Sequence, residues 1–301
     1  MTVSSSSSSH LRNIQAIAQL VKFRAYILEQ TRAGFFDNQY GNLDKGIAVW
    51  IRGNRSRSDF TLLALEAYIF NKPLSLQDLC DFISITRNTA KTIVREALSF
   101  GIIVAEKSGR QYLVSASREF YQGYLTAQLC EWQLMSAADG QAIGTAFRDL
   151  KSDPNLGQGD TNVELALQIL ILSRSESVKT NRSGGRKKGA NKTVSLLGQW
   201  VSMNSFNREL LFLIMHARIT SQPLRYLPTM KTLAVSRNSL KQSIFAAQDI
   251  GVIDADVLMA TEQALDDYLQ WHLTTFARIG DRNIEMIASF FLGLEDHELA
   301  F

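Results

Sequence analysis

The sequence predicts a mainly α-helical chain with small β wings, divided into two domains of similar build. Residues 60–103 and 210–253 align without a gap at a shift of 150, and eleven of the 44 aligned pairs are identical. Apolar residues recur at helical spacing, most clearly in the first segment, and a short β-rich stretch follows that segment. A chain of 301 residues is long enough for two domains of ordinary size.

The identical pairs mark equivalent points of the two segments. Self-similarity at a fixed spacing indicates a duplicated domain, here of about 120 residues. The shift that aligns the segments also pairs two tryptophans that precede them. The matches include Pro-Leu at 73–74 and 223–224, Arg-Asn at 87–88 and 237–238, Lys91 with Lys241, Gly101 with Gly251, and Trp50 with Trp200.

The first segment predicts three helices. An apolar helix over 60–70 is expected to stop near Pro73. Ser75 then suits the N-cap of a short helix over 76–83, and Thr86 that of a longer helix over 87–100, with a tight turn between them. Glycine after the longer helix is typical of a C-terminus. In that helix one face is expected to be buried, consisting of Ala90, Ile93, Val94, Ala97 and Leu98.

Residues 102–117, "IIVAEKSGRQYLVSAS", predict a β-hairpin with a basic tip, and a long helix over 118–135 follows. Helix, helix, turn, helix, hairpin and helix is the element order of a winged helix-turn-helix. The second segment is six residues shorter between Gly251 and the matching Tyr-Leu, and it carries Asp254 and Asp256 there. We therefore expect a degenerate second wing without a basic tip.

The stretch "LSLQDLCDFISITRNTAKTIVREALSFGIIVAEKSGRQYLVSASREFYQGYL", Leu74 to Leu125, resembles the DNA-binding core of the MarR family. The second segment is similar to it through the longer helix and then diverges, and the first wing lacks the family's acidic-x-Arg element. Members are bacterial regulators of about half this length, and their terminal helices interlock in homodimers. Because this chain carries both halves, the resemblance implies a monomer acting as an intramolecular pseudo-dimer. Its shared base would comprise the helices at 11–30, 118–136, 160–173 and 261–279.

The resulting domain organisation has four parts. A Ser-rich tail, expected to be disordered, precedes the first MarR-like domain, and a connector marked by Asp-Pro and glycines separates the two domains. The second domain has the degenerate wing. The boundaries are 1–9 for the tail, 10–137 for the first domain, 138–159 for the linker and 160–301 for the second domain.

These features favour a cytoplasmic, sequence-specific transcriptional regulator that binds double-stranded DNA. The polar face of each longer helix would enter the major groove, where Arg suits guanine and Asn suits adenine. The wing would contact the DNA backbone, and a basic loop over 173–192 is either a solvated loop or an arm lying along phosphates. The candidate DNA-binding residues are Thr86, Arg87, Asn88, Thr89, Lys91, Thr92, Arg95, Lys107, Arg110, Arg186, Lys187, Lys188, Arg237, Asn238, Ser239, Lys241 and Gln242.

Other functions are less well supported by the sequence. The net charge of +3 is mild, and no run of eighteen apolar residues could span a membrane. The two cysteines and four histidines form no metal-ligand spacing, and no catalytic constellation or phosphate loop is present, so we expect neither an enzyme nor a cofactor. A plasmid or phage replication initiator and a winged-helix protein–protein scaffold are the alternatives. The sequence does not identify a small-molecule effector.

Overall fold

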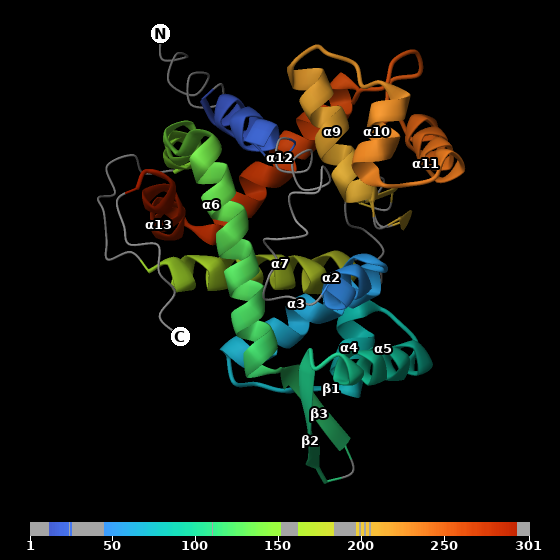
Figure 1. Cartoon of the computed structure of the whole chain (residues 1–301), viewed down its shortest axis with the longest axis vertical. Helices are drawn as coiled ribbons and strands as arrows, with labels where there is room; N and C mark the ends of the chain where they lie inside the picture. The colour runs from blue at the N-terminus through green and yellow to red at the C-terminus, as the bar shows by residue number, and fades with distance from the viewer. Residues whose placement is uncertain are drawn as a thin grey trace. The chain divides into compact units, whose positions relative to one another are not determined.

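A computed structural model describes residues 12–23, 25, 45–109, 111–151, 162–183, 197–198, 200–201, 203–204 and 206–293. Over these residues the chain is mainly helical with one small three-stranded antiparallel sheet, as predicted (Figure 1). None of the helices in this part of the chain has the length and apolar character required to cross a membrane.

The chain divides into two compact units. The first-repeat unit contains the described residues between 45 and 130 together with 164–183. The second-repeat unit contains residues 12–25, 131–163 and 197–293, again as far as they are described. Each unit therefore combines segments that are far apart in the sequence.

The first-repeat unit builds its sheet beside its helices. Strand β3 lies at the centre, in the order β1-β3-β2, and the hairpin pairs Ile103 with Ala116 at its base. Strand β1 was not predicted, because two residues are too short to show a periodicity. The elements are α2 (Lys45–Arg52), α3 (Arg55–Ile69), β1 (Leu74–Ser75), α4 (Leu76–Ile83), α5 (Arg87–Ser99), β2 (Ile103–Ser108), β3 (Gln111–Ala116), the start of α6 (Arg118–Asp149) and nearly all of α7 (Val163–Ser183).

The predicted caps and turn of the first repeat are confirmed, whereas the apolar helix predicted over 60–70 begins earlier, at Arg55. Ser75 and Asp78 form a reciprocal capping box at the start of α4. Ser84 turns the chain in the left-handed conformation, with φ of 56° and ψ of 45°. Thr86 caps α5, and Gly101, at φ 67°, has the positive φ that favours glycine after a helix.

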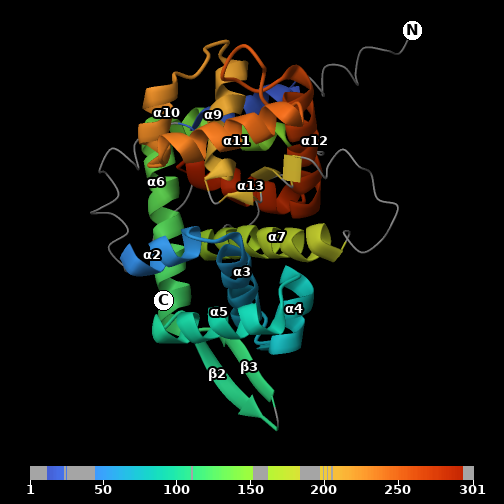
Figure 2. The ribbon, with the colours of Figure 1, turned by 90° about the vertical axis from the view of Figure 1, so that its right-hand side faces the viewer.

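The second-repeat unit repeats this backbone at the same shift. Ala234 has the left-handed conformation of Ser84, and Gly251 has the positive φ of Gly101. The hairpin is absent here, and a single bridge joins Ile253 to Ala260, which is the shortening that the sequence predicted. The unit's helices are α9 (Asn207–Ile219), α10 (Tyr226–Leu233), α11 (Arg237–Asp249), α12 (Glu262–Ile279) and α13 (Asp281–Phe291) (Figure 2).

Helix α7, which precedes the second repeat in the sequence, packs in the first-repeat unit. The hydroxyl of Tyr121 on α6 donates to Glu164 at 3.0 Å and accepts from Gln168 at 2.6 Å. Burial, with the Glu164 carboxylate beside it, raises the pKa of Tyr121, so its hydroxyl keeps its proton. Further along α7, Lys179 forms an ion pair with Glu66 of α3.

The helix at the start of the chain packs in the second-repeat unit, although it precedes the first repeat in the sequence. The helical residues 12–23 belong to the second-repeat unit, where Ala16, Ile17 and Val21 join its main hydrophobic core. That core also contains Trp200 and Tyr268, both almost completely buried. Each repeat is therefore covered by the helix that lies before the other repeat in the sequence.

Two glycines allow α13 to pack closely against the second part of α6. A Cβ atom at Gly140 or Gly144 would collide with backbone or side-chain atoms of α13 and of Leu292 just after it. Helix α6 continues through the start of the predicted linker, after a break in helical geometry at Asp139 (φ −170°, ψ 75°). The Gly-x-x-x-Gly spacing is thus a helix-packing feature of this chain.

A buried ion cluster joins the same two elements. Glu285 on α13 accepts from Arg148 at 2.8 Å and from Lys151 at 2.7 Å. The side chains of Glu285 and Lys151 are only 5% and 4% exposed. Burial opposes ionisation of Glu285, but its hydrogen bonds to Lys151 and Arg148 outweigh this effect, and its pKa is lowered.

Replacing Glu285 with Gln is expected to lower the free energy of unfolding by about 3 kcal/mol, because it removes the buried carboxylate that both Arg148 and Lys151 contact. Asp266→Asn, an exposed carboxylate on α12, is the matched control and should leave the unfolding midpoint nearly unchanged. Because the folded-state pKa of Glu285 is lowered, its contribution is present above its unfolded-state pKa and is lost as the pH falls through the folded value. Denaturant unfolding at neutral and acidic pH measures both effects, and equal midpoints for the two variants would contradict this role.

A second titrating group lies within the aromatic cluster of α12. The centroid of the His272 ring lies 4.4 Å from that of the Tyr268 ring and 4.7 Å from that of the Trp271 ring. Its Nε2 atom has no contact with solvent and no hydrogen-bond partner among the described residues. Burial lowers the pKa of His272 to about 4, so the folded state holds the ring neutral.

Stability should therefore decrease as the pH falls from about 6.5 towards 4, because the unfolded chain binds a proton at His272 that the folded chain excludes. The shift corresponds to about 2 kcal/mol less stability at pH 5 than at pH 7.5. His272→Phe removes this titration and should flatten the pH dependence of the unfolding free energy over that interval. The same slope in both proteins would show that His272 does not titrate as described.

Candidate nucleic-acid interface

Helix α5 presents two chemically different faces. Ala90, Ile93 and Ala97 are buried, as the spacing predicted. The rest of the predicted buried stripe is corrected: Val94 is only half-buried, and Leu98 lies outside the core with 43% of its surface exposed. The buried stripe is therefore narrow, and most of the helix circumference faces solvent.

Trp50, on α2, anchors α5. Its indole Nε1 donates to the carboxylate of Glu96 on α5 at 2.8 Å. The same carboxylate pairs with Arg57 at 2.8 Å, and the Arg57 guanidinium lies 5.3 Å from the Trp50 ring centre. The contacts among Trp50, Arg57 and Glu96 set the rotation of α5 about its axis, and hence which of its residues are exposed.

The polar face of α5 contains every candidate that the sequence placed there. Arg87, Asn88, Lys91 and Arg95 are all exposed. Within the described part of the chain, none of these four side chains has an ion pair or a hydrogen bond. Their donors are therefore available to an external partner.

The three threonines of this face are engaged locally. The Thr86 hydroxyl accepts the backbone N–H of Thr89 at 3.2 Å, and the two hydroxyls lie 2.9 Å apart. Thr92 donates to the carbonyl oxygen of Asn88 at 3.1 Å. All three residues are exposed, but their first role is to cap and brace the helix.

The hairpin of β2 and β3 projects beyond α5 in the same unit (Figure 2). Lys107 lies near its tip, exposed and opposite Tyr112 on the partner strand. Four other predicted contacts lie outside the described residues: Arg110 of the same hairpin, and Arg186, Lys187 and Lys188 of the basic loop.

Helix α11 offers a similar face with one significant substitution. Arg237, Asn238, Lys241 and Gln242 are exposed, whereas Ser239 is half-buried and bonded to the cap residue Ser236. At the position that matches Arg95 the second repeat has Phe245, whose surface is 53% exposed. This exchange is visible in the sequence when the two repeats are compared residue by residue, but it was not predicted.

The shortened wing has its own internal structure. Asp254 pairs with Arg218 at 3.3 Å and accepts the backbone N–H of Asp256 at 3.0 Å. Arg218 also contacts Glu262 at 3.2 Å. Asp254 therefore holds the loop in place, whereas Asp256 is exposed.

The exposed polar faces of α5 and α11 are suited to binding. Arginine, lysine and asparagine side chains provide donors for phosphates and base edges. No group of His, Cys, Asp and Glu among the described residues could hold a metal ion. Comparison of the chain with protein-family models, with curated proteins and with solved structures found no match.

The two acids of the shortened wing should differ in their effect on stability. Asp254→Ala removes the partner of Arg218 and the acceptor of the Asp256 N–H, and it should lower the unfolding free energy by about 1 kcal/mol. Asp256→Ala removes an exposed carboxylate and should have little effect. Thermal unfolding of the two variants provides the comparison, and equal stability would contradict a structural role for Asp254.

Proposed function

We propose that this protein is a sequence-specific, double-stranded DNA-binding transcriptional regulator with two winged helix-turn-helix domains, similar in design to MarR-family regulators. One observation carries the proposal. The four long polar side chains on one face of α5, Arg87, Asn88, Lys91 and Arg95, are exposed and have no partner in the described chain. Trp50 holds one side of α5, and the exposed side carries donors without a partner in the described chain. Such a helix has the chemistry needed to enter a major groove.

Each side chain has a suitable partner in duplex DNA. Arg87 and Arg95 can donate two hydrogen bonds to the O6 and N7 atoms of guanine, and Asn88 can form paired bonds with adenine. Lys91 suits a phosphate or a base, and Lys107 on the hairpin suits the backbone beside the groove. Cofactors are not needed for this function, and it would be exercised in a bacterial cytoplasm.

The exchanged helices support the pseudo-dimer part of the proposal. Residues 12–23 complete the core of the second-repeat unit, and α7 packs in the first-repeat unit. Two subunits of a homodimer that interlock through terminal helices would bury those helices in the same reciprocal way. A single chain would then act as a monomer with two diverged reading domains.

The divergence favours the first repeat as the main DNA contact. It retains Arg95 and a full hairpin, whereas the second repeat has Phe245 and a loop with two acids. Carboxylates at the wing repel phosphates. We therefore propose a non-palindromic binding site whose stronger half lies under the first repeat, with Arg237, Asn238, Lys241 and Gln242 as the corresponding candidates of the second.

Selection of bound fragments from random duplex DNA tests the proposal directly. On the selected site, Arg87→Ala should weaken binding by about 1–3 kcal/mol if the guanidinium contacts a base. Lys91→Ala should weaken binding at every sequence and reduce the salt dependence by about one counter-ion, if its partner is a phosphate. Arg278→Ala removes an exposed cation of α12, outside both reading faces, and is the charge-matched control.

The double variant Arg87→Ala/Lys91→Ala decides the outcome. Affinity equal to that of the Arg278→Ala control would count against DNA as the partner of this face. Selected sites that are perfect palindromes, with both halves equally sensitive to base changes, would contradict the proposed asymmetry between the repeats.

A further inference from the structure

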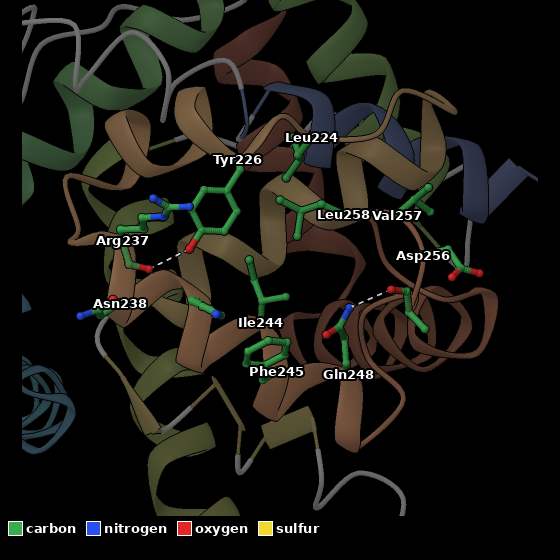
Figure 3. Close-up of a pocket in the computed structure, with 12 residues that line it drawn as sticks. Leu224, Tyr226, Arg237, Asn238, Ile244, Phe245, Gln248, Asp256, Val257 and Leu258 are labelled. Carbon is green, nitrogen blue, oxygen red and sulfur yellow. Dashed lines mark hydrogen bonds between the residues drawn. The ribbon is translucent and has the colours of Figure 1, made fainter.

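The second repeat contains a groove on the side where the first repeat carries its reading face. It has a volume of about 590 Å³ and lies between α10, α11 and the loop over 254–258 (Figure 3). Leu224, Ile244 and Leu258 provide much of its apolar wall, and Phe245 and Val257 extend that wall towards solvent. Phe245 and Val257 are 53% and 38% exposed.

The groove results from the two differences between the repeats. Phe245 replaces the arginine of the matching position, so an apolar ring lines a surface where the first repeat has a cation. The hairpin is reduced to one bridge, and the loop after it contributes Val257 and Leu258 to the groove. Both changes add apolar side chains to a face that is polar in the first repeat.

Duplex DNA could contact the Arg237 and Lys241 part of this surface, but it would leave the apolar part unfilled. In the major groove the thymine methyl is the main apolar group, and it is far smaller than the space available here. The exposed Asp256 at the edge of the groove repels phosphates. A chain of amino acids, by contrast, can place several large apolar side chains in a groove of this kind.

The charges of the groove indicate what else the occupant contains. Arg237 and Lys241 line one part of it, exposed and without an ion pair in the described chain. The Lys241 ammonium lies 5.4 Å from the centre of the Phe245 ring. Asp256 lies on the other side of the groove from Arg237 (Figure 3). An occupant with carboxylates at one end and apolar side chains in the middle satisfies this arrangement.

We propose that the groove docks an acidic, amphipathic segment of a partner protein. Its apolar side chains pack on Phe245, Leu258 and Ile244, and its carboxylates pair with Arg237 and Lys241. DNA contact then rests mainly with α5 and its hairpin, while the second repeat recruits a protein. The inference rests on the proposed function in treating the two faces as equivalent surfaces of diverged domains.

Peptide selection tests the proposal on the full chain. A display library of random 16-residue peptides is selected on the immobilised wild-type protein, with counter-selection against Phe245→Glu. Because Phe245 is half-exposed, this variant should fold, and an unchanged thermal midpoint verifies that it does. The enriched peptides are then synthesised, and their affinities are measured by fluorescence anisotropy.

Enriched peptides should combine Leu, Phe or Trp with Asp or Glu. Their affinity should fall at least tenfold for Phe245→Glu and for Lys241→Glu. Arg95→Glu, the same change at the matching position of the first repeat, should leave peptide binding unaltered and abolish binding to duplex DNA. No peptide that distinguishes wild type from Phe245→Glu, or enrichment of basic peptides, would overturn the docking site.

Measuring the affinity for duplex DNA with the same protein preparations separates the two proposals. Loss of DNA affinity in Phe245→Glu as large as in Arg95→Glu would make the groove part of the DNA interface and overturn the inference. Specific peptide binding by a protein that binds no DNA would overturn the proposed function and leave the docking site standing. DNA binding by a protein for which no Phe245-dependent peptide is found would overturn the docking site and leave the proposed function standing.

Discussion

The candidate interface depends on how a tryptophan holds the third helix of each repeat. Trp50 donates its indole N–H to the side chain of Glu96 on α5, and Trp200 donates to the carbonyl oxygen of Ser243 on α11 at 3.0 Å. Trp200 is completely buried, so its N–H must find an acceptor inside the protein. Because each tryptophan fixes one side of its helix, the opposite side necessarily faces outward. The polar residues on that side are thus displayed at a defined angle.

The same backbone supports two different surfaces. The left-handed residues Ser84 and Ala234 and the positive-φ glycines Gly101 and Gly251 recur at matching positions, so the turns that orient the helices are shared. The chemistry carried on those turns has diverged, since a ring replaces Arg95 and an acidic loop replaces the hairpin. Turn geometry constrains only a few residues, whereas an exposed helix face is free to change. The two matching segments can therefore share their turns while their exposed helix faces differ.

The exchanged helices explain why neither repeat is a contiguous piece of sequence. Residues 12–23 present Ala16, Ile17 and Val21 to a core formed by the second repeat, and α7 meets α3 and α6 of the first. An amphipathic helix must bury its apolar face, but its sequence does not specify against which element. Polar contacts help to determine where the helix packs. Tyr121 and Glu66 both contact α7 in the first-repeat unit, and the hydropathy pattern alone does not predict these contacts.

The amino-acid sequence by itself determined the local structure: the caps at Ser75 and Thr86, the glycine ends at Gly101 and Gly251, and the shortened second wing. These features depend on neighbouring residues and on backbone conformation, so they can be deduced from short stretches. The polar face of α5 was predictable for the same reason, although Leu98, expected in the core, lies outside it. Only the tertiary structure decided which helix covers which repeat, the close packing at Gly140 and Gly144, and the groove beside Phe245. Each of these depends on the three-dimensional contact of segments distant in sequence, which no local pattern encodes.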